Sequence, residues 1–157
     1  MTITYNIPKI SELAQLCKLN DYLFELSLNN FDNTLDKNWQ NSKEYRAYFS
    51  RYFKPNNYLL VAYDGENMVG YTSGSIRKSE EYRKPFLIAD MENLMVLPKY
   101  QKQKIGYTLI QNFTEWAKSK NTERINISVF AKNTKTLDFY RRLGYEDYGI
   151  NLEKPIK

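Results

Sequence analysis

A long, nearly uninterrupted apolar segment at residues 86–97 constrains the fold of this chain more than any other feature. Pro98 ends the segment, because the residue before a proline disfavours helical geometry. Its length and apolarity are typical of a central strand that is covered on both faces. An amphipathic helical pattern follows at 105–120, and a further strand is predicted at 124–130. This strand–helix–strand order predicts a parallel connection of right-handed sense.

The remaining patterns predict short elements on both sides of this unit, with no internal repeat and no linker. They are, in chain order, a strand at 2–7, a helix capped by Ser11 and reaching 28, a polar loop at 29–41, a helix at 42–53, strands at 58–63 and 68–73, a helix at 134–143 closed by Gly144, and a strand at 145–152. The turn between the two middle strands contains Asp64-Gly65, a strong hairpin signal. We expect one domain over residues 1–157, of the α/β or α+β class with a mixed sheet.

The absence of histidine restricts the chemistry that this chain can perform. Serine–histidine–aspartate triads, cysteine–histidine pairs and histidine-based metal sites are excluded, and no metal cofactor is expected. Acid–base catalysis must therefore use carboxylates, tyrosine, lysine or cysteine. The single cysteine, Cys17, excludes an internal disulfide, and its place on an apolar helical face predicts a core thiol rather than a nucleophile.

The chain offers no run of 18 apolar residues, and its first five residues lack the features of a secretory signal, so we expect a cytoplasmic protein without a membrane span. Its formal charge of +5 is uneven: residues 1–97 carry 11 Lys+Arg and 12 Asp+Glu, whereas 98–157 carry 12 and 6. The second part is suited to an anion, either nucleic acid or a small phosphate-bearing ligand, although charge alone favours a solvated surface. No helix carries basic residues over several turns, so nucleic acid is the weakest hypothesis and is not expected as a partner.

Residues 90–106 combine the end of the buried strand, a basic loop and the start of a helix near Lys104. The first amides of a helix lack internal partners, and the helix dipole places partial positive charge there. This end of the helix can therefore bind a phosphate. Gly106 allows the backbone to approach such a ligand closely.

Two spaced motifs resemble those of the GNAT superfamily of N-acetyltransferases. The first, Gln101-x-x-Lys104-x-Gly106, is similar to the acetyl-CoA motif Gln/Arg-x-x-Gly-x-Gly/Ala, and the second runs from Asn133 through Phe139-Tyr140 to Leu143-Gly144-Tyr145. With the strand around Val69-Gly70-Tyr71, the resemblance covers about residues 58–152. It implies a mixed, mostly antiparallel sheet with one parallel crossover and helices on both faces. It also implies acetyl-CoA as cosubstrate, without a metal.

The resemblance further implies which residues hold the cosubstrate. The backbone amides of Leu94 and Val96 would bind the pantetheine arm as an added strand, and one of them would polarise the thioester carbonyl. The implied contacts are Leu94, Met95, Val96, Gln101, Lys102, Gln103, Lys104, Ile105, Gly106, Tyr107, Asn133 and Tyr140. Lys104 replaces the first glycine of the motif. We expect that glycine to serve for clearance, so that Lys104 turns its side chain outward rather than adopting a strained positive φ.

Direct transfer to an amine requires a base for the ammonium proton, and the resemblance assigns Tyr140 as the acid that protonates the leaving thiolate. Glu92 is the first candidate for the base, on the strand face of Leu94 and Val96 by the two-residue period, and Asp90 on that face is the reserve. Ion pairs with basic residues such as Arg77 or Arg124 are the alternative for both carboxylates. Asn133 fits either a CoA contact or a plain helix N-cap.

The acceptor is the least constrained part of the prediction. Residues 20–54 are rich in aromatic and acidic side chains, which suits a cationic amine but equally describes an amphipathic helix with a solvated face. We expect an acetyl-CoA-dependent N-acetyltransferase that acts on a primary amine of a small molecule. A protein or peptide acceptor and a CoA-binding module without catalysis are the alternatives, and the sequence is compatible with a homodimer.

Overall fold

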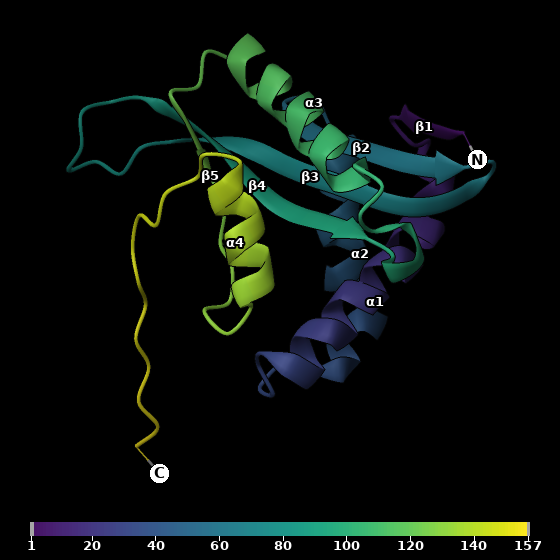
Figure 1. Cartoon of the computed structure of the whole chain (residues 1–157), viewed down its shortest axis with the longest axis horizontal. Coiled ribbons are helices and arrows are strands. Elements are labelled where there is room, and N and C mark those ends of the chain that lie inside the picture. The colour runs from purple at the N-terminus through teal and green to yellow at the C-terminus, as the bar shows by residue number, and fades with distance from the viewer. Residues whose placement is uncertain (1, 157) are drawn as a thin grey trace.

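A five-stranded sheet runs through the middle of the molecule in the order β1-β2-β3-β4-β5 (Figure 1). The computed structural model describes residues 2–156. The strands are β1 (Ile3–Asn6), β2 (Asn57–Asp64), β3 (Asn67–Lys78), β4 (Leu87–Val96) and β5 (Arg124–Asn126). The first four pair antiparallel, and β4 pairs parallel to β5. The mixed, mostly antiparallel sheet with one parallel crossover is thus confirmed.

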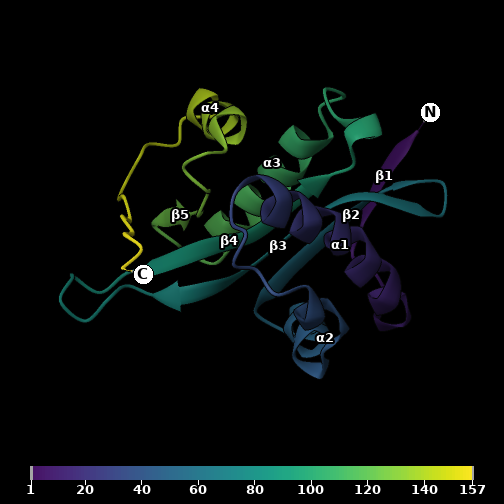
Figure 2. The ribbon, with the colours of Figure 1, turned by 90° about the horizontal axis from the view of Figure 1, so that it is seen from below.

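Helices cover both faces of the sheet, as expected (Figures 1 and 2). The helices are α1 (Leu13–Asn30), α2 (Lys43–Ser50), α3 (Ile105–Ser119) and α4 (Thr134–Arg142), with short 3-10 segments η1 (Ile10–Glu12), η2 (Lys37–Asn41), η3 (Arg51–Phe53) and η4 (Pro98–Tyr100). On the α1–α2 face, Leu16 and Phe49 are fully buried in one core with Tyr71 of β3. On the α3 face, Phe113 packs in a second core with Tyr140 of α4.

Local patterns predicted most elements correctly. The Ser42 hydroxyl caps α2 by accepting the Tyr45 amide at 3.0 Å, and the hairpin turn places Gly65 at a φ of 59°. Gly144 closes α4 at a φ of 88°, as expected. The expected cap at Ser11 is wrong, because Ser11 lies inside η1 and α1 begins only at Leu13. The expected loop at 29–41 also contains the helical turn η2.

The expected strand at 145–152 is wrong, and β5 ends at Asn126 instead of reaching residue 130. A strand requires a neighbour to receive its backbone hydrogen bonds. The β4–β5 pairing spans only Ile88–Asp90 and Arg124–Asn126. Within residues 2–156, no further strand lies beyond β5, so these segments lack a partner.

A β-bulge at Glu92 controls the direction of the side chains in β4. Ser73 pairs with Asn93 and the next residue of β3, Gly74, pairs with Met91, so Glu92 is the extra residue. Glycine is required opposite the bulge, because a Cβ on Gly74 would overlap the Asp90 carbonyl oxygen and lie 2.6 Å from the Phe113 ring. From Glu92 onwards, the alternation of side chains between the two faces of β4 is therefore shifted by one residue.

Replacing Gly74 by alanine is expected to reduce the free energy of unfolding by about 1–3 kcal/mol, since the added methyl group overpacks the sheet against α3. Urea unfolding of the purified variant measures this. Gly106→Ala is the matched control, because a Cβ there meets no atom of another element nearer than 3.8 Å. Equal stability of the two variants would contradict the close approach at Gly74.

Candidate active site

The edge of β4 that faces β5 is open beyond Asp90. The Leu97 amide donates to the Val69 carbonyl of β3 at 2.9 Å. Because antiparallel ladders alternate, the amides of Leu94 and Val96 point away from β3, towards the side where β5 has ended. The Gln101 side chain reaches back to this edge and donates to the Val96 carbonyl at 3.0 Å. The open edge can therefore accept an extended ligand as an additional strand.

The N-terminus of α3 lies just beyond this edge and has no side-chain cap. Lys104 occupies the N-cap position but makes no capping hydrogen bond, whereas the Asn133 side chain caps α4 by accepting the Thr136 amide. The first-turn amides of α3 are thus left without an acceptor from the N-cap side chain, at the positive end of the helix dipole. This arrangement suits an anion such as a diphosphate.

Lys104 has a φ of 64°, so the expectation of ordinary backbone geometry there is wrong. The backbone at this position adopts the left-handed conformation, which glycine adopts without cost. A lysine in this conformation lowers the stability of the folded protein by about 1 kcal/mol. Lys102 also has a positive φ, of 62°, so the loop turns twice in three residues. The side chains of Lys102 and Lys104 are exposed next to the helix entrance.

Gly106 lies in the first turn of α3 with free space around its α-carbon. A Cβ there would be 3.8 Å from both the Phe139 ring and a Val96 methyl group, which is ordinary contact. The protein itself therefore does not require glycine at this position. The free space at Gly106 therefore matters only for a ligand that binds close to the backbone of α3.

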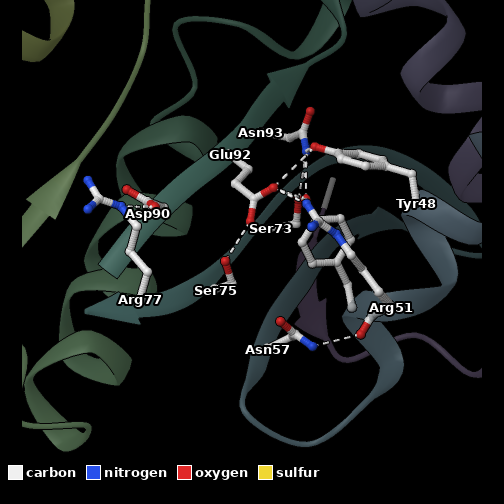
Figure 3. Close-up of polar contacts among 10 residues, drawn as sticks. Tyr48, Arg51, Asn57, Ser73, Ser75, Arg77, Asp90, Glu92 and Asn93 are labelled. Carbon is white, nitrogen blue, oxygen red and sulfur yellow. Dashed lines mark hydrogen bonds and ion pairs between the residues drawn. The ribbon is translucent and has the colours of Figure 1, made fainter. Parts of the chain in front are cut away.

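The Glu92 carboxylate lies in a dense polar cluster between β4, β3 and η3 (Figure 3). It forms an ion pair with Arg51 and accepts hydrogen bonds from the Tyr52 hydroxyl at 2.8 Å and the Ser75 hydroxyl at 2.7 Å. The Arg51 guanidinium lies 4.4 Å from the centre of the Tyr48 ring and 4.8 Å from that of Tyr52. These three contacts fix the orientation of the Glu92 carboxylate.

The neighbouring residue Asn93 joins the same cluster. Its amide donates to the Tyr48 hydroxyl at 3.1 Å and to the Ser73 hydroxyl at 3.0 Å. Glu92 and Asn93 therefore both point to the α1–α2 face, which only a bulge permits. The prediction that Glu92 shares a face with Leu94 and Val96 is wrong for this reason, since those two residues pack on the α3 face.

Asp90 shares the face of Glu92, as predicted, but it is engaged in a separate ion pair. It binds the Arg77 guanidinium at 2.6 Å and accepts from the Asn126 amide at 3.0 Å. Figure 3 shows this pair apart from the Glu92 cluster. The geometry favours a structural role for Asp90, in which it ties β3 to the end of β5.

Tyr140 is almost fully buried, with 6% of its surface exposed. It packs with β4 and α3 and contacts the Tyr145 ring edge-on, at 5.4 Å between ring centres. Burial raises the pKa of the Tyr140 phenol well above its ordinary value. The side chain is therefore protonated throughout the physiological range.

Asn133 and Cys17 each have a structural role in this fold. The Asn133 side chain forms the N-cap of α4, at 3.3 Å from the Thr136 amide. Cys17 packs beside the α1–α2 core, and burial, together with the charge of Asp21, raises the pKa of its thiol. A raised pKa disfavours the nucleophilic thiolate, in agreement with a core role.

The aromatic side chains of residues 20–54 mostly pack on one another. Trp39 contacts Phe24, Tyr45 and Tyr48, with ring centres 4.9–6.0 Å apart. An open hollow of about 520 Å³ lies over this group, lined by Phe24, Thr34, Leu35, Asp36, Asn38, Trp39 and Ser42. Because Tyr48 connects Trp39 to the Glu92 cluster, the hollow and the carboxylate lie on the same side of the sheet.

Sequence reasoning missed Arg51 as the partner of Glu92, and it missed Asn93 and Ser75 in the cluster. Tyr48 and Arg51 are three residues apart and therefore neighbours on one helical face, a signal that was available. The sequence carries no signal for the pairing of Arg51 with Glu92, because this pairing depends on the bulge in β4. Within residues 2–156, no group of three or more cysteine and carboxylate side chains is arranged to hold a metal ion. None of the helices in that range is long and apolar enough to cross a bilayer.

Known proteins share this sequence pattern and this fold. The model of the acetyltransferase (GNAT) family matches residues 20–145. A Bacillus subtilis (strain 168) protein, whose assigned activity is N-acetylation of alanine in ribosomal protein bS18, is 23% identical over 130 residues, which are 83% of this chain and 76% of that protein.

Solved structures agree over the whole chain, at sequence identities that show the fold alone. A variant of the BH1408 protein from Bacillus halodurans has a TM-score of 0.86 at 15% identity, with 100% of both chains covered. The aminoglycoside N-acetyltransferase AAC(6')-Iy, in complex with a CoA-containing bisubstrate analogue, has a TM-score of 0.72 at 14% identity over 100% of this chain and 99% of that one. Glucosamine-6-phosphate N-acetyltransferase from Arabidopsis thaliana has a TM-score of 0.70 at 16% identity, with 100% of both chains covered.

The open edge of β4, the uncapped entrance of α3 and the two motifs in the sequence all fall within the matched range. Because the family match spans well over half of the residues, this chain belongs to the GNAT family of acetyltransferases and is an N-acetyltransferase.

Proposed function

We propose that this protein transfers an acetyl group from acetyl-CoA directly to a primary amine of a small molecule. The observation that carries the proposal is that three features follow one another along β4 and into α3: the Glu92 carboxylate, the free amides of Leu94 and Val96, and the uncapped amides of α3. Members of this family use acetyl-CoA, and AAC(6')-Iy is a structural neighbour with CoA bound.

The first-turn amides of α3 hold the diphosphate of the cosubstrate, with Lys102 and Lys104 adding positive charge. The amides of Leu94 and Val96 hold the pantetheine arm, and one of them donates a hydrogen bond to the thioester carbonyl oxygen. This donor stabilises the negative charge that develops on that oxygen during attack by the amine.

Glu92 receives the proton of the attacking ammonium group, directly or through a water molecule. A primary ammonium has a pKa of about 10.4, so it must lose this proton before it can attack. In the protein without acceptor, Arg51 is the positive partner of the Glu92 carboxylate. When the acceptor binds, its ammonium group replaces Arg51 as this partner. Tyr140 then protonates the sulfur of the leaving CoA.

The hollow beside Trp39 is the place we assign to the acceptor. Its walls combine aromatic rings with the Asp36 carboxylate, which suits a cationic amine. Small-molecule amines are acetylated by AAC(6')-Iy and by the glucosamine-6-phosphate enzyme, as their names state, which supports this choice over a protein acceptor. The name of the Bacillus subtilis relative supports the protein acceptor instead.

A second function, CoA binding without catalysis, is favoured by one observation. The Glu92 carboxylate is already bound by Arg51, Tyr52 and Ser75, so an acceptor amine must displace one of these partners before it can reach the carboxylate. A panel of amines, assayed for thiol release from acetyl-CoA, separates the two functions. Release with at least one amine supports catalysis, whereas cosubstrate binding without release supports the second function.

Gly106→Val is expected to weaken CoA binding at least about tenfold, because the branched side chain crowds the phosphates. Saturation at 100 times the Kd stabilises a protein by about 2.7 kcal/mol, so the wild type should melt several degrees higher with CoA, and the variant should shift much less. Gln111→Val is the matched control, since Gln111 is exposed further along α3. Equal shifts in all three proteins would show that the phosphates bind elsewhere.

Glu92→Gln is expected to lower kcat by about 10²–10⁴, because the amide cannot accept the proton, while the CoA-induced rise in Tm is retained. Asp90→Asn is the control, and we expect its kcat to change by no more than a few-fold. Steady-state thiol release with the best amine measures both. A larger loss in Asp90→Asn would transfer the role of base to that carboxylate.

Tyr140→Phe is expected to lower kcat, whereas Tyr145→Phe in the same core cluster should leave it nearly unchanged. A general acid must be protonated to act, and the raised pKa keeps Tyr140 protonated above pH 10. The kcat of the wild type should therefore show no fall on the alkaline side between pH 7 and 10. An alkaline limb in this interval that disappears in Tyr140→Phe would contradict the raised pKa.

A further inference from the structure

The guanidinium of Arg51 is only partly used by the protein. Each of the nitrogens of a guanidinium carries an N–H donor. Within residues 2–156, only Nη2 of Arg51 makes hydrogen bonds, to the Glu92 carboxylate and to the Tyr52 hydroxyl, the latter at 2.9 Å. The Nε–H is buried and has no acceptor in that part of the chain. Buried donors without a partner are rare in folded proteins, and an acceptor oxygen on a ligand would satisfy this one.

Aromatic rings, rather than further hydrogen bonds, hold the guanidinium in place. It lies over the rings of Tyr48 and Tyr52, which attract a cation whichever anion that cation binds. The backbone of Arg51 is also fixed, because the Asn57 side chain donates to its carbonyl oxygen at 2.9 Å (Figure 3). The guanidinium can therefore exchange one anionic partner for another without leaving its aromatic site.

The Glu92 cluster is balanced in charge before an acceptor binds. Glu92 and Arg51 compensate each other, and the nearby Asp90 carboxylate has its own partner in Arg77. The other members of the cluster are uncharged: Tyr48, Tyr52, Ser73, Ser75 and Asn93. An ammonium group that binds Glu92 adds one positive charge, so the guanidinium loses its partner and lies beside a second cation. A partly buried charge without a partner is costly.

Arg51 is the partner of Glu92 that an acceptor can displace most easily. Its side chain is 40% exposed, whereas Tyr52 is only 3% exposed and belongs to the core under α2. Displacement breaks the ion pair with Glu92 but leaves the contacts of the guanidinium with the two rings in place. The guanidinium then needs a new anion close to the old one.

We propose that the acceptor is a zwitterion, a small amine that carries a carboxylate or phosphate group within a few bonds of the reacting nitrogen. This inference rests on the proposed function. The ammonium group binds Glu92, and the anionic group binds Arg51. Nε–H and Nη2–H donate from one edge of the guanidinium and form a fork for two oxygens. The charge of the cluster is then the same before and after binding, and Arg51 determines the specificity for the acceptor.

Matched pairs of amines test the proposal. β-Alanine is compared with β-alaninamide, and aminoethyl phosphate with ethanolamine, by kcat/KM for thiol release from acetyl-CoA. We expect the anionic member of at least one pair to be favoured at least about tenfold, as for a charge-assisted hydrogen bond. The pair that shows the preference distinguishes carboxylate from phosphate. Efficient release with the uncharged members and no preference in either pair would overturn the proposal and leave the acetyltransferase function intact.

Arg51→Gln should change the two members of a pair in opposite directions. The kcat/KM of the anionic member should fall at least about tenfold, whereas that of the uncharged member should stay equal or rise, because no cation competes for Glu92. Arg51→Lys, which keeps the charge but not the fork, should lie between wild type and Arg51→Gln. Arg46→Gln, at an exposed position of α2, is the matched control and should keep the wild-type preference. An equal loss for both members in Arg51→Gln would mean a merely structural role for Arg51.

Binding without turnover separates this inference from the proposed function. Calorimetric titration of the CoA-saturated protein should give a Kd at least about tenfold lower for the anionic member of the favoured pair, and Arg51→Gln should remove this difference. Selective binding in the absence of thiol release would refute catalysis but support the role of Arg51. Equal Kd values within both pairs would refute that role whether or not thiol is released.

Discussion

The close approach of β3 to β4 at Gly74 is the constraint on which the rest of this structure depends. It allows one extra residue, Glu92, to bulge out of β4. Before the bulge, Ala89 and Met91 pack against α3, and after it Leu94 takes over that face. The polar cluster and the apolar floor under α3 are thus produced by one irregularity, which also lets Glu92 and Asn93 point to the same side.

The local parts of this fold could be predicted from the sequence, and the non-local parts could not. The helices expected at 42–53 and 105–120 follow from patterns of residues within a few positions of each other. The bulge depends on a contact between Gly74 and Phe113, which are far apart in the chain. The positive φ of Lys104 was not predicted, because lysine carries no signal for this conformation and only the family glycine indicated it.

The Arg51–Glu92 pair explains how a carboxylate can be both well fixed and available. In the free protein, Arg51 and the hydroxyls of Tyr52 and Ser75 satisfy the charge of Glu92, so the carboxylate costs little although only 21% of the side chain is exposed. Both rings that flank Arg51 belong to the α2–η3 segment, which packs on the sheet through Phe49. An ammonium group that enters this cluster meets a negative charge whose orientation is already set, which lowers the cost of ordering it.

The missing strand at 145–152 and the early end of β5, which was expected to reach residue 130, have one common cause. Both segments carry alternating apolar residues, and both lack a neighbour within the described chain, so neither can form a ladder beyond Asn126. Alternation reports which face of a strand is buried, whereas a strand forms only where a second backbone offers hydrogen bonds.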